Sequence, residues 1–320
     1  MRRNPRSAVF AAPDVDVRGI GGAVTKKASE GEMTNPFLLT KSSVISFSGG
    51  RTSGMMLKLI LDAHGGTLPD NAIVTFANTG REMPQTLDFV QECSERWNVP
   101  IVWLEFDLEA EGKTAVVNYN TASRNGEPFT AVIRWKQMLP NVMMRFCTIE
   151  LKIRRQQAYA RQAFGSLDYD AILGLRADEG ARVKKALGTG IPRNRTPLYF
   201  AGLTKRDVIA FWSDQEFDLR LESVNGVTPA GNCDLCFLKG KTLLAGLMAR
   251  YPKTARWWIE REQEAGAECI RKGRSAEAGR FRRSQDYASY AEQFDTVQRQ
   301  GDLLEGWQDV ENIDCIACTD

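Results

Sequence analysis

The sequence predicts an α/β fold: a doubly wound parallel sheet with helices on both faces, followed by a mostly helical C-terminal region. The first reason is that short β-branched and aromatic runs at 44–47, 72–77 and 101–106 alternate with helix-like stretches. The second is that a further strand-like run at 170–175 follows a basic helical stretch. This alternation is typical of parallel strands joined by right-handed helical crossovers. The third is the mostly helical pattern of residues 242–300.

A loop of glycines and hydroxyl residues follows the first expected strand, 44–47, and opens into an expected helix at 53–64. Strand, glycine turn and helix start together point successive backbone N–H groups into one concavity, at the positive end of a helix dipole. Gly49 and Gly50 have no Cβ, so the backbone can approach an anion closely. We predict a phosphate site here, and the alternative is an ordinary glycine turn with a Ser or Thr N-cap. The other candidate residues of this site are Ser46, Ser48, Arg51, Thr52 and Ser53.

A second polar glycine loop, Asn78-Thr79-Gly80, follows the expected strand at 72–77 and precedes an expected helix at 84–97. Proline suits the first turn of a helix, and Pro84 occupies that position. Ligands of parallel sheets bind beyond the carboxyl ends of the strands. We therefore expect both glycine loops at the same edge of one sheet, with Asn78, Thr79 and Gly80 near the bound phosphate.

The expected strand at 170–175 contains Gly174 and leads directly into Arg176, with Arg182 six residues further on. Guanidinium groups suit phosphate oxygens because their N–H donors form a planar fork. We expect both arginines to contact phosphate. The intervening Asp178 and Glu179 either hold a Mg²⁺ ion that bridges phosphates or pair with Arg182.

Composition and charge limit the classes of function. The 320 residues are 43% hydrophobic and 26% charged with a net charge of +2, which indicates a globular protein rather than one that coats nucleic acid. No stretch has the length and apolar character of a membrane span or a secretory signal, and we expect a cytoplasmic protein. The single histidine, His64, argues against Ser-His-Asp or multi-His chemistry. We expect it at the surface or at a helix cap.

Three regions are expected along the chain. Residues 1–40 are rich in Arg, Ala, Gly and Lys without periodicity, and we expect a mostly disordered leader, with Met33 as an alternative start. Residues 41–240 are expected to form the α/β domain, which the resemblance described next implies is nucleotide-binding. Residues 241–320 are expected to form a helical region that ends in a cysteine-bearing tail.

Taken together and in this order, these motifs resemble the phosphoadenosine phosphosulfate (PAPS) reductase family, which belongs to the adenine nucleotide α-hydrolase-like superfamily with the PP-loop ATP pyrophosphatases. The likeness covers roughly residues 42–240. The Ser-Gly-Gly-x-x-Ser loop resembles the PP-loop, and the Asn78 loop resembles the family's Asp-Thr-Gly element. The segment from Gly174 to Arg182 resembles its Gly-Ile-Arg…Arg element. By the same likeness Lys152, at a fixed offset from Cys147, is expected to bind the nucleotide.

The chain also departs from the family pattern. Thr52 stands where PP-loop pyrophosphatases have Asp, and Asn78 stands where the reductases have Asp. The Glu-Cys-Gly-Leu-His tail, which supplies the nucleophilic thiol of the reductases, is absent. The pair Cys315 and Cys318 near the C-terminus is the candidate replacement, or it completes a metal site.

Seven cysteines are an odd number for a disulfide-stapled protein, so we expect thiols in a reducing compartment. Cys233-x-x-Cys236 has the spacing of a chelating turn, and Cys147 lies upstream of it. A [4Fe–4S] cluster would need a fourth thiolate, most simply Cys318 or Cys315. All-sulfur ligation suits a cluster or zinc. The resemblance favours the cluster over zinc, and buried thiols without metal are the plain alternative.

Three functions remain open. The leading one is thiol-dependent reduction of a sulfonucleotide, PAPS or APS, to sulfite, with Cys315 or Cys318 as the attacking thiolate near Arg176. The second is an ATP pyrophosphatase that adenylates a nucleic-acid or small-molecule acceptor for sulfur transfer, with Mg²⁺ and Arg176 stabilising the pyrophosphate. The third is a non-catalytic subunit that binds nucleotide or cluster. The expected partners are the nucleotide and a thiol or sulfur donor protein, with nucleic acid only under the second function and no membrane.

Overall fold

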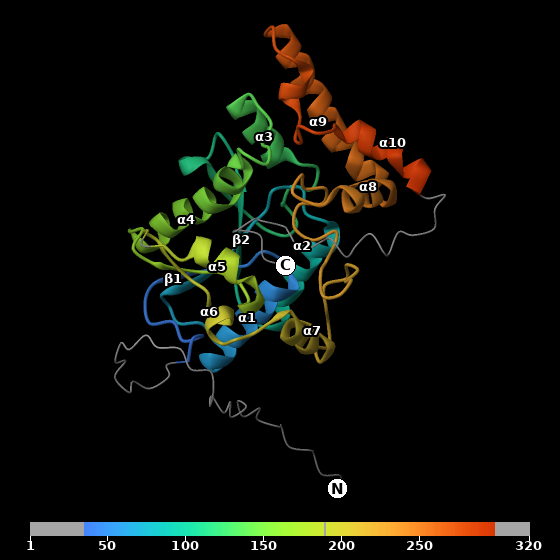
Figure 1. Ribbon diagram of the computed structural model, residues 1–320. Helices are drawn as coiled ribbons and strands as arrows, with labels where there is room; N and C mark the ends of the chain where they lie inside the picture. The colour runs from blue at the N-terminus through green and yellow to red at the C-terminus, as the bar shows by residue number, and fades with distance from the viewer. Residues whose placement is uncertain (1–34, 189, 298–320) are drawn as a thin grey trace, which may run out of the picture. The chain divides into compact units, whose positions relative to one another are not determined.

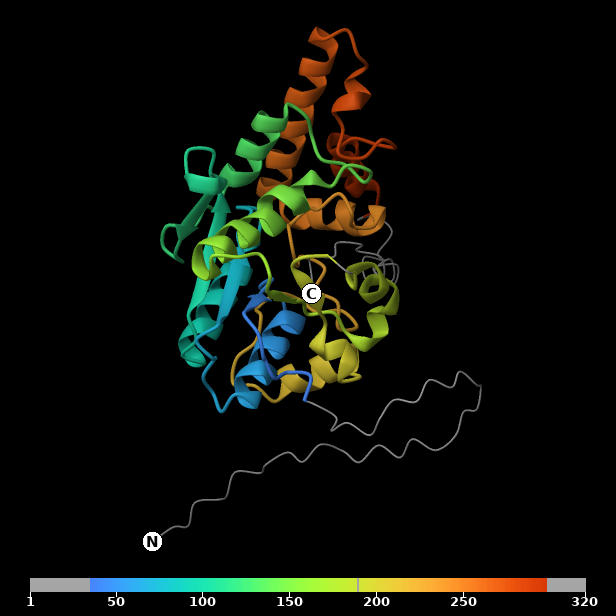
Figure 2. The ribbon, with the colours of Figure 1, turned by 90° about the vertical axis from the view of Figure 1, so that its left-hand side faces the viewer.

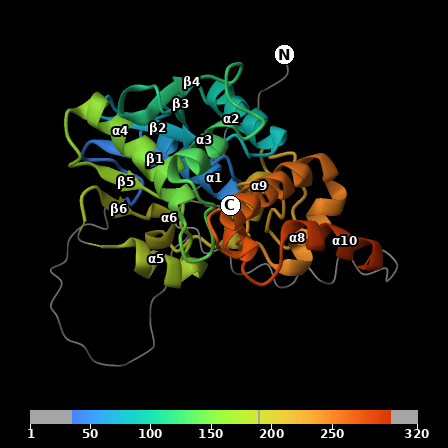
Figure 3. The ribbon, with the colours of Figure 1, turned by 90° about the horizontal axis from the view of Figure 1, so that it is seen from above.

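A computed structural model describes residues 35–188 and 190–297. Within these residues the chain forms a sheet of six strands in the order β4-β3-β2-β1-β5-β6 (Figures 1 and 3). Every pair of neighbouring strands in this sheet is parallel except β3 and β4. The strands are β1 (Ser43–Ser46), β2 (Ala72–Ala77), β3 (Ile101–Phe106), β4 (Thr114–Val117), β5 (Asp170–Ile172) and β6 (Arg193–Arg195).

Helices connect these strands and cover the sheet, so the predicted α/β fold is confirmed. The antiparallel strand β4 is the departure from the expected all-parallel sheet, and it forms the edge beside β3. The helices are α1 (Arg51–Ala63), α2 (Pro84–Arg96), α3 (Glu127–Lys136), α4 (Arg154–Phe164), α5 (Gly180–Ala186), α6 (Pro197–Phe200), α7 (Lys205–Ser213), α8 (Lys241–Arg250), α9 (Pro252–Arg271) and α10 (Tyr287–Val297).

The two faces of the sheet pack against different helices, as the alternation of side chains along β1 shows. Ile45 belongs to the main hydrophobic core together with Met56 and Ile60 of α1. Its neighbour Val44 points the other way and packs with Ala160 of α4. Because successive strand residues face opposite sides, this pattern places α1 and α4 on opposite faces. Figure 3 shows these two helices on either side of the strands.

The C-terminal helices α8, α9 and α10 lie beside one another (Figure 1) and share the main core with the sheet. Trp258 of α9 is completely buried, and so is Tyr287 at the start of α10. Phe129 of α3 packs edge-on against Trp258, which ties α3 to α9 (Figure 2). The expected helical region beyond residue 240 therefore packs on the sheet and its helices through a continuous apolar core.

Most of the expected leader, residues 1–34, lies outside the described residues, but residues 35–40 belong to the fold. Phe37 and Leu39 are buried in the main core. The backbone N–H of Leu39 donates to Nε2 of His64, at a distance of 3.0 Å. His64 is also the C-cap residue of α1, and a helix cap was one of the two positions expected for it. None of the described helices combines the length and apolar character that a bilayer crossing requires.

Candidate functional site

The glycine loop connects β1 to α1 at the carboxyl edge of the sheet. Gly49 is buried and has a φ of +79°, which L side chains rarely adopt. A Cβ at this position would lie 2.6 Å from Cγ2 of Thr86 on α2, so the position needs glycine. Gly50 is the N-cap of α1 with extended backbone angles, which other residues can also adopt. The turn at Gly49 therefore packs against α2, and the first backbone N–H groups of α1 follow it directly.

Two serine hydroxyls fix the shape of this loop. Oγ of Ser53 donates to the carbonyl of Gly50 at 2.9 Å and accepts from the backbone N–H of Ser48 at 3.2 Å. Oγ of Ser48 donates to Oγ of Ser53 at 3.0 Å. Ser53 is completely buried. Its hydroxyl therefore shapes the loop, whereas backbone N–H groups at the helix start are the donors suited to an anion.

Arg176 brings the end of β5 to the glycine loop. Its Nη1 donates to Oγ1 of Thr52 at 3.2 Å, and its Nε donates to Oδ1 of Asp178 at 3.0 Å. Its backbone N–H donates to Oε2 of Glu179 at 2.9 Å. β1 lies between β2 and β5, which is where the order of connection reverses and where ligands of open α/β sheets bind. Arg176 and the glycine loop are therefore neighbours, as predicted.

Arg51 lies in the glycine loop, yet its guanidinium points into the protein. Its Nε donates to Oδ1 of Asp218 at 2.8 Å, its Nη1 to Oγ1 of Thr228 at 2.9 Å, and its Nη2 to the carbonyl of Leu221 at 3.0 Å. The Arg51 carbonyl accepts from Nε1 of Trp212 at 2.8 Å. This residue anchors the loop to the segment 212–228 by its side chain, and only its backbone faces the helix start.

The Asn78 loop is shaped by buried polar contacts. Nδ2 of Asn78 donates to Oε1 of Glu105 at 2.6 Å, and its Oδ1 accepts from the N–H of Gly80 at 3.1 Å. Burial raises the pKa of Glu105, while hydrogen bonds from Ser123 and Asn78 oppose that rise. The N–H of Thr79 donates to Glu82 at 2.9 Å. The side-chain amide of Asn78, which stands where the family has a carboxylate, is thus buried and bonds to the Glu105 carboxylate of β3.

The Cys233-x-x-Cys236 turn packs directly on this loop. Sγ of Cys233 lies 3.6 Å from Oγ1 of Thr79, and the N–H of Asp234 donates to the carbonyl of Arg81 at 2.8 Å. The Asp234 carboxylate forms an ion pair with the Arg81 guanidinium and accepts from Nε1 of Trp258 at 2.7 Å. Burial raises the pKa of Asp234 to about 6, with Arg81 acting in the opposite direction. This turn therefore links the strand end of β2 to α9.

The other predicted residues of the described chain lie on the elements that follow β4 and β5. Cys147 precedes a π-helix, Thr148–Ile153, that contains the buried Lys152. Gly174 is buried after β5, and Arg182 on α5 pairs with Glu179. Gln156 of α4, which the sequence analysis missed, links Oγ of Ser46 (3.1 Å) to Oγ1 of Thr75 (3.1 Å). One glutamine among the three of this basic helix gives no sequence signal of such a bridge.

The described residues do not by themselves form a metal site. No group of three or more His, Cys, Asp or Glu side chains within residues 35–188 and 190–297 could hold a metal ion. Cys315 and Cys318 lie outside these residues, so the proposed fourth ligand and the tail thiol are not described. Glu179 pairs with Arg182, as the second of the two expected roles has it, whereas Asp178 pairs with Arg176 instead of Arg182.

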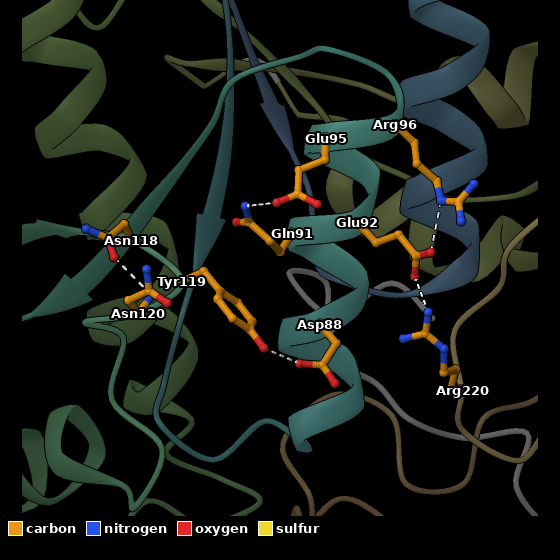
Figure 4. A pocket seen from close by; sticks show the side chains of 9 residues that line it. All are labelled: Asp88, Gln91, Glu92, Glu95, Arg96, Asn118, Tyr119, Asn120 and Arg220. Atoms are coloured by element: carbon orange, nitrogen blue, oxygen red, sulfur yellow. Dashed lines mark hydrogen bonds and ion pairs between the residues drawn. The ribbon is translucent and has the colours of Figure 1, made fainter.

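A hollow of about 580 Å³ beside α2 is separate from this site (Figure 4). Its carboxylates already have partners: Asp88 accepts from the Tyr119 hydroxyl at 2.6 Å, and Glu92 accepts from Arg96 at 2.9 Å and from Arg220 at 2.6 Å. These contacts tie α2 to the segments after β4 and after α7. The polar groups that line the hollow therefore hold α2 against the neighbouring segments.

Comparison with known proteins agrees with this geometry. The model of the phosphoadenosine phosphosulfate reductase domain matches residues 42–186, from β1 to the end of α5. The uncharacterized nin region protein ORF290 of Escherichia phage lambda is 31% identical over 215 residues, covering 65% of this chain and 69% of that protein. An uncharacterized 37.8 kDa protein from the gpa 5′ region of Escherichia phage 186 is 25% identical over 268 residues, covering 73% and 78%. The matched residues include the glycine loop, the Asn78 loop and Arg176, and the chain belongs to the phosphoadenosine phosphosulfate reductase family.

Proposed function

We propose that the protein binds an adenine sulfonucleotide, PAPS or APS, beyond the carboxyl ends of β1 and β5 and reduces it to sulfite with electrons from a thiol donor. The observation that carries this proposal is the hydrogen bond of 3.2 Å between Arg176 and Thr52, which joins an arginine from one strand end to the helix start of another. Family members bind nucleotide at this part of the fold, so the arrangement favours a nucleotide phosphate as the ligand.

The electrostatics of the loop support an anionic ligand. The start of α1 carries backbone N–H groups and the positive end of the helix dipole, and no acidic residue lies in its first turn. Arg176 is oriented from both sides, since Asp178 holds its Nε and Thr52 accepts from its Nη1. A phosphate beside Thr52 would receive donors from both directions. Only the backbone of Arg51 contributes to this phosphate site, because its guanidinium is bonded to Asp218.

The proposed reaction needs a thiolate and a second thiol. The thiolate of Cys315 or Cys318 attacks the sulfonate sulfur, forming an S–S bond while the S–O bond to the nucleotide phosphate breaks and the nucleotide leaves with that electron pair. A thiol of the donor protein then attacks the cysteine sulfur, forms a mixed disulfide and releases sulfite. A second donor thiol resolves this disulfide, so the donor dithiol supplies both electrons.

A [4Fe–4S] cluster on Cys147, Cys233, Cys236 and Cys318 is a separate proposal. The described part of the chain places only Cys233 and Cys236 on one turn, with the Cys236 N–H donating to the Cys233 carbonyl at 3.3 Å. No step of the reaction above depends on a metal. Iron, zinc and sulfide analysis of anaerobically purified protein tests the cluster, and a sample without stoichiometric iron would leave these cysteines as thiols or zinc ligands.

The decisive experiment incubates anaerobically purified protein with PAPS, APS or ATP and a dithiol donor, and measures sulfite, AMP and pyrophosphate. Sulfite from PAPS or APS is the expected result. AMP and pyrophosphate from ATP would instead identify an ATP pyrophosphatase, and binding without turnover would identify a nucleotide-binding subunit. Cys315→Ser and Cys318→Ser should reduce sulfite release while nucleotide binding persists, with Cys269→Ser in α9 as the matched control. Full activity in both tail variants would contradict the tail nucleophile.

A further inference from the structure

Residues of β4, the end of α3 and α4 line a cleft of about 880 Å³. Figure 3 shows the ribbons of these three elements. We propose that this cleft binds single-stranded nucleic acid, with a base stacked on Trp135 and phosphates on the arginines of α4. The site is distinct from the proposed nucleotide site, because it is built on the face of the sheet opposite α1.

Helix α4 presents two cations along one side of the cleft. Arg154 and Arg161 both line it, and both are exposed. They are seven residues apart, which is two helical turns and roughly 10 Å along the axis. The helix Arg154–Phe164 contains three arginines, three glutamines and no acidic residue. A row of cations on this spacing suits a backbone that carries repeated negative charges.

The acidic residues of the cleft do not cancel this charge. The lining includes four cationic residues and two acidic ones, Glu111 and Glu150. Glu150 is buried and already neutralised, since its Oε1 lies 2.9 Å from both Nζ of Lys136 and Nη1 of Arg154. Subtracting two from four leaves a charge of +2 on the lining residues, and Lys136 beside them adds one more.

Trp135 supplies an aromatic surface among these cations. Its side chain lines the cleft and the residue is 38% exposed, which is unusual for a tryptophan. Nζ of Lys136 lies 4.1 Å from a ring centroid of the indole, and Nζ of Lys113 lies 5.4 Å from it. A base stacked on the indole would have its neighbouring phosphates within reach of two ammonium groups. Base stacking together with cationic residues is the usual way of binding a single strand.

Hydrogen bonds beneath the cleft fix its floor. Arg155 is buried beneath it, donating from Nη1 to the Gly112 carbonyl at 3.0 Å and to Oγ1 of Thr114 at 2.9 Å. Its Nε donates to the Glu150 carbonyl at 2.8 Å. These bonds fix the turn before β4 against α4.

A single strand fits this site better than a duplex, because the bases of a duplex are stacked internally and cannot cover Trp135.

The test is fluorescence anisotropy of a 5′-labelled oligothymidylate of about 15 nucleotides, in the absence of adenine nucleotides. The full chain should bind the single strand more tightly than a duplex of equal length. Trp135→Ala should weaken binding roughly 5- to 150-fold, and Trp135→Phe should retain part of it. Arg154→Gln/Arg161→Gln should weaken binding and lower the slope of log K against log salt by about 1.4, which is about 0.7 for each lost phosphate contact.

The matched control is Arg206→Gln/Arg256→Gln, which removes the same charge from exposed arginines of α7 and α9, outside the cleft. Equal weakening by both double variants would show a general charge effect and overturn the proposal. Unchanged binding by Trp135→Ala would also overturn it, as would equally tight binding of a polyglutamate probe. Because no adenine nucleotide is present, failure of the proposed reductase activity would not affect this measurement. Circular dichroism melting confirms that each variant is folded.

Discussion

Nη1 of Arg176 donates to Oγ1 of Thr52 across 3.2 Å, although the two residues are 124 positions apart in the chain. Thr52 lies in the first turn of α1, and Arg176 follows β5. The bond therefore connects the strands on either side of the reversal in the sheet. It also orients the guanidinium toward the helix start, where the proposed phosphate lies.

Replacing Arg176 with alanine should weaken binding of PAPS or APS while leaving the fold intact. A charge-assisted hydrogen bond contributes about 1.5 to 3 kcal/mol, so we expect a loss of roughly 10- to 100-fold in affinity by isothermal titration calorimetry. Arg206→Ala on α7, an exposed arginine, is the control. An unchanged dissociation constant for Arg176→Ala would remove Arg176 from the proposed site.

The two loop glycines should respond differently to substitution. Gly49→Ala should lower the melting temperature, because its φ of +79° is strained for alanine and its Cβ would lie 2.6 Å from the Thr86 side chain. We expect a cost of about 1 to 3 kcal/mol. Gly50→Val should instead preserve most of the stability and block nucleotide binding, because Gly50 has extended backbone angles. Thermal melts with and without PAPS separate the two effects, and the reverse pattern would contradict this description of the loop.

The ion pair between Arg81 and Asp234 should be strongly coupled. The two side chains are 7% and 6% exposed, so Asp234→Ala would leave a buried guanidinium without its carboxylate. We expect a loss of about 3 to 5 kcal/mol in urea unfolding, and a smaller loss in the double variant Arg81→Met/Asp234→Leu. The surface pair of Lys58 and Asp62 is the control, since Asp62→Ala should change stability by less than about 1 kcal/mol. Additive effects of the single substitutions would argue against coupling.

Glu262 should make stability depend on pH. Burial raises its pKa to about 7, although it accepts from the N–H groups of Phe281 (2.8 Å) and Tyr287 (2.6 Å). The folded state thus holds this proton more tightly than the unfolded chain does. The resulting stabilisation is fully present below the ordinary glutamate pKa of 4.5 and is lost as the pH rises through about 7. It amounts to as much as about 3 kcal/mol.

The melting temperature of the wild type should therefore fall between about pH 5 and pH 8 by more than that of Glu262→Gln. The amide does not titrate, so its curve lacks this component. Glu260→Gln, an exposed position on the same helix, should keep the wild-type profile. Parallel curves for the wild type and Glu262→Gln would show that Glu262 does not titrate in this range.

The central strands and their helices were predictable from the sequence. Strands were expected at 72–77 and 101–106, and β2 and β3 have these same bounds, because both are apolar runs buried in the sheet. The placement of the two strand-end loops at one edge of the sheet also followed from topology alone, because β1 and β2 are parallel neighbours. In contrast, β4 and β6 were not predicted. The sequence of β6 is Arg-Asn-Arg, which has no strand pattern, and it forms by pairing its backbone with β5.

The contacts within the site were less predictable, because they join residues far apart in the chain. Arg51 was expected to contact phosphate since it lies in the loop, yet its partner Asp218 is 167 positions away. Asn78 was expected near the nucleotide, and its buried amide bonds to Glu105 of β3. Local spacing gives the order of such residues along the chain. It does not show which polar side chains turn inward once the layers pack.

The anchoring of Arg51 makes the glycine loop depend on residues outside the matched region. Its guanidinium is 12% exposed and depends on Asp218, Thr228 and neighbouring carbonyls, all of which lie beyond the region that the family shares. A fragment cut after residue 186 would leave this cation buried without its carboxylate, so the matched region lacks part of its own support. Conversely, an insertion between 212 and 228 would shift the first turn of α1 through Arg51, with the glycine loop itself left unaltered.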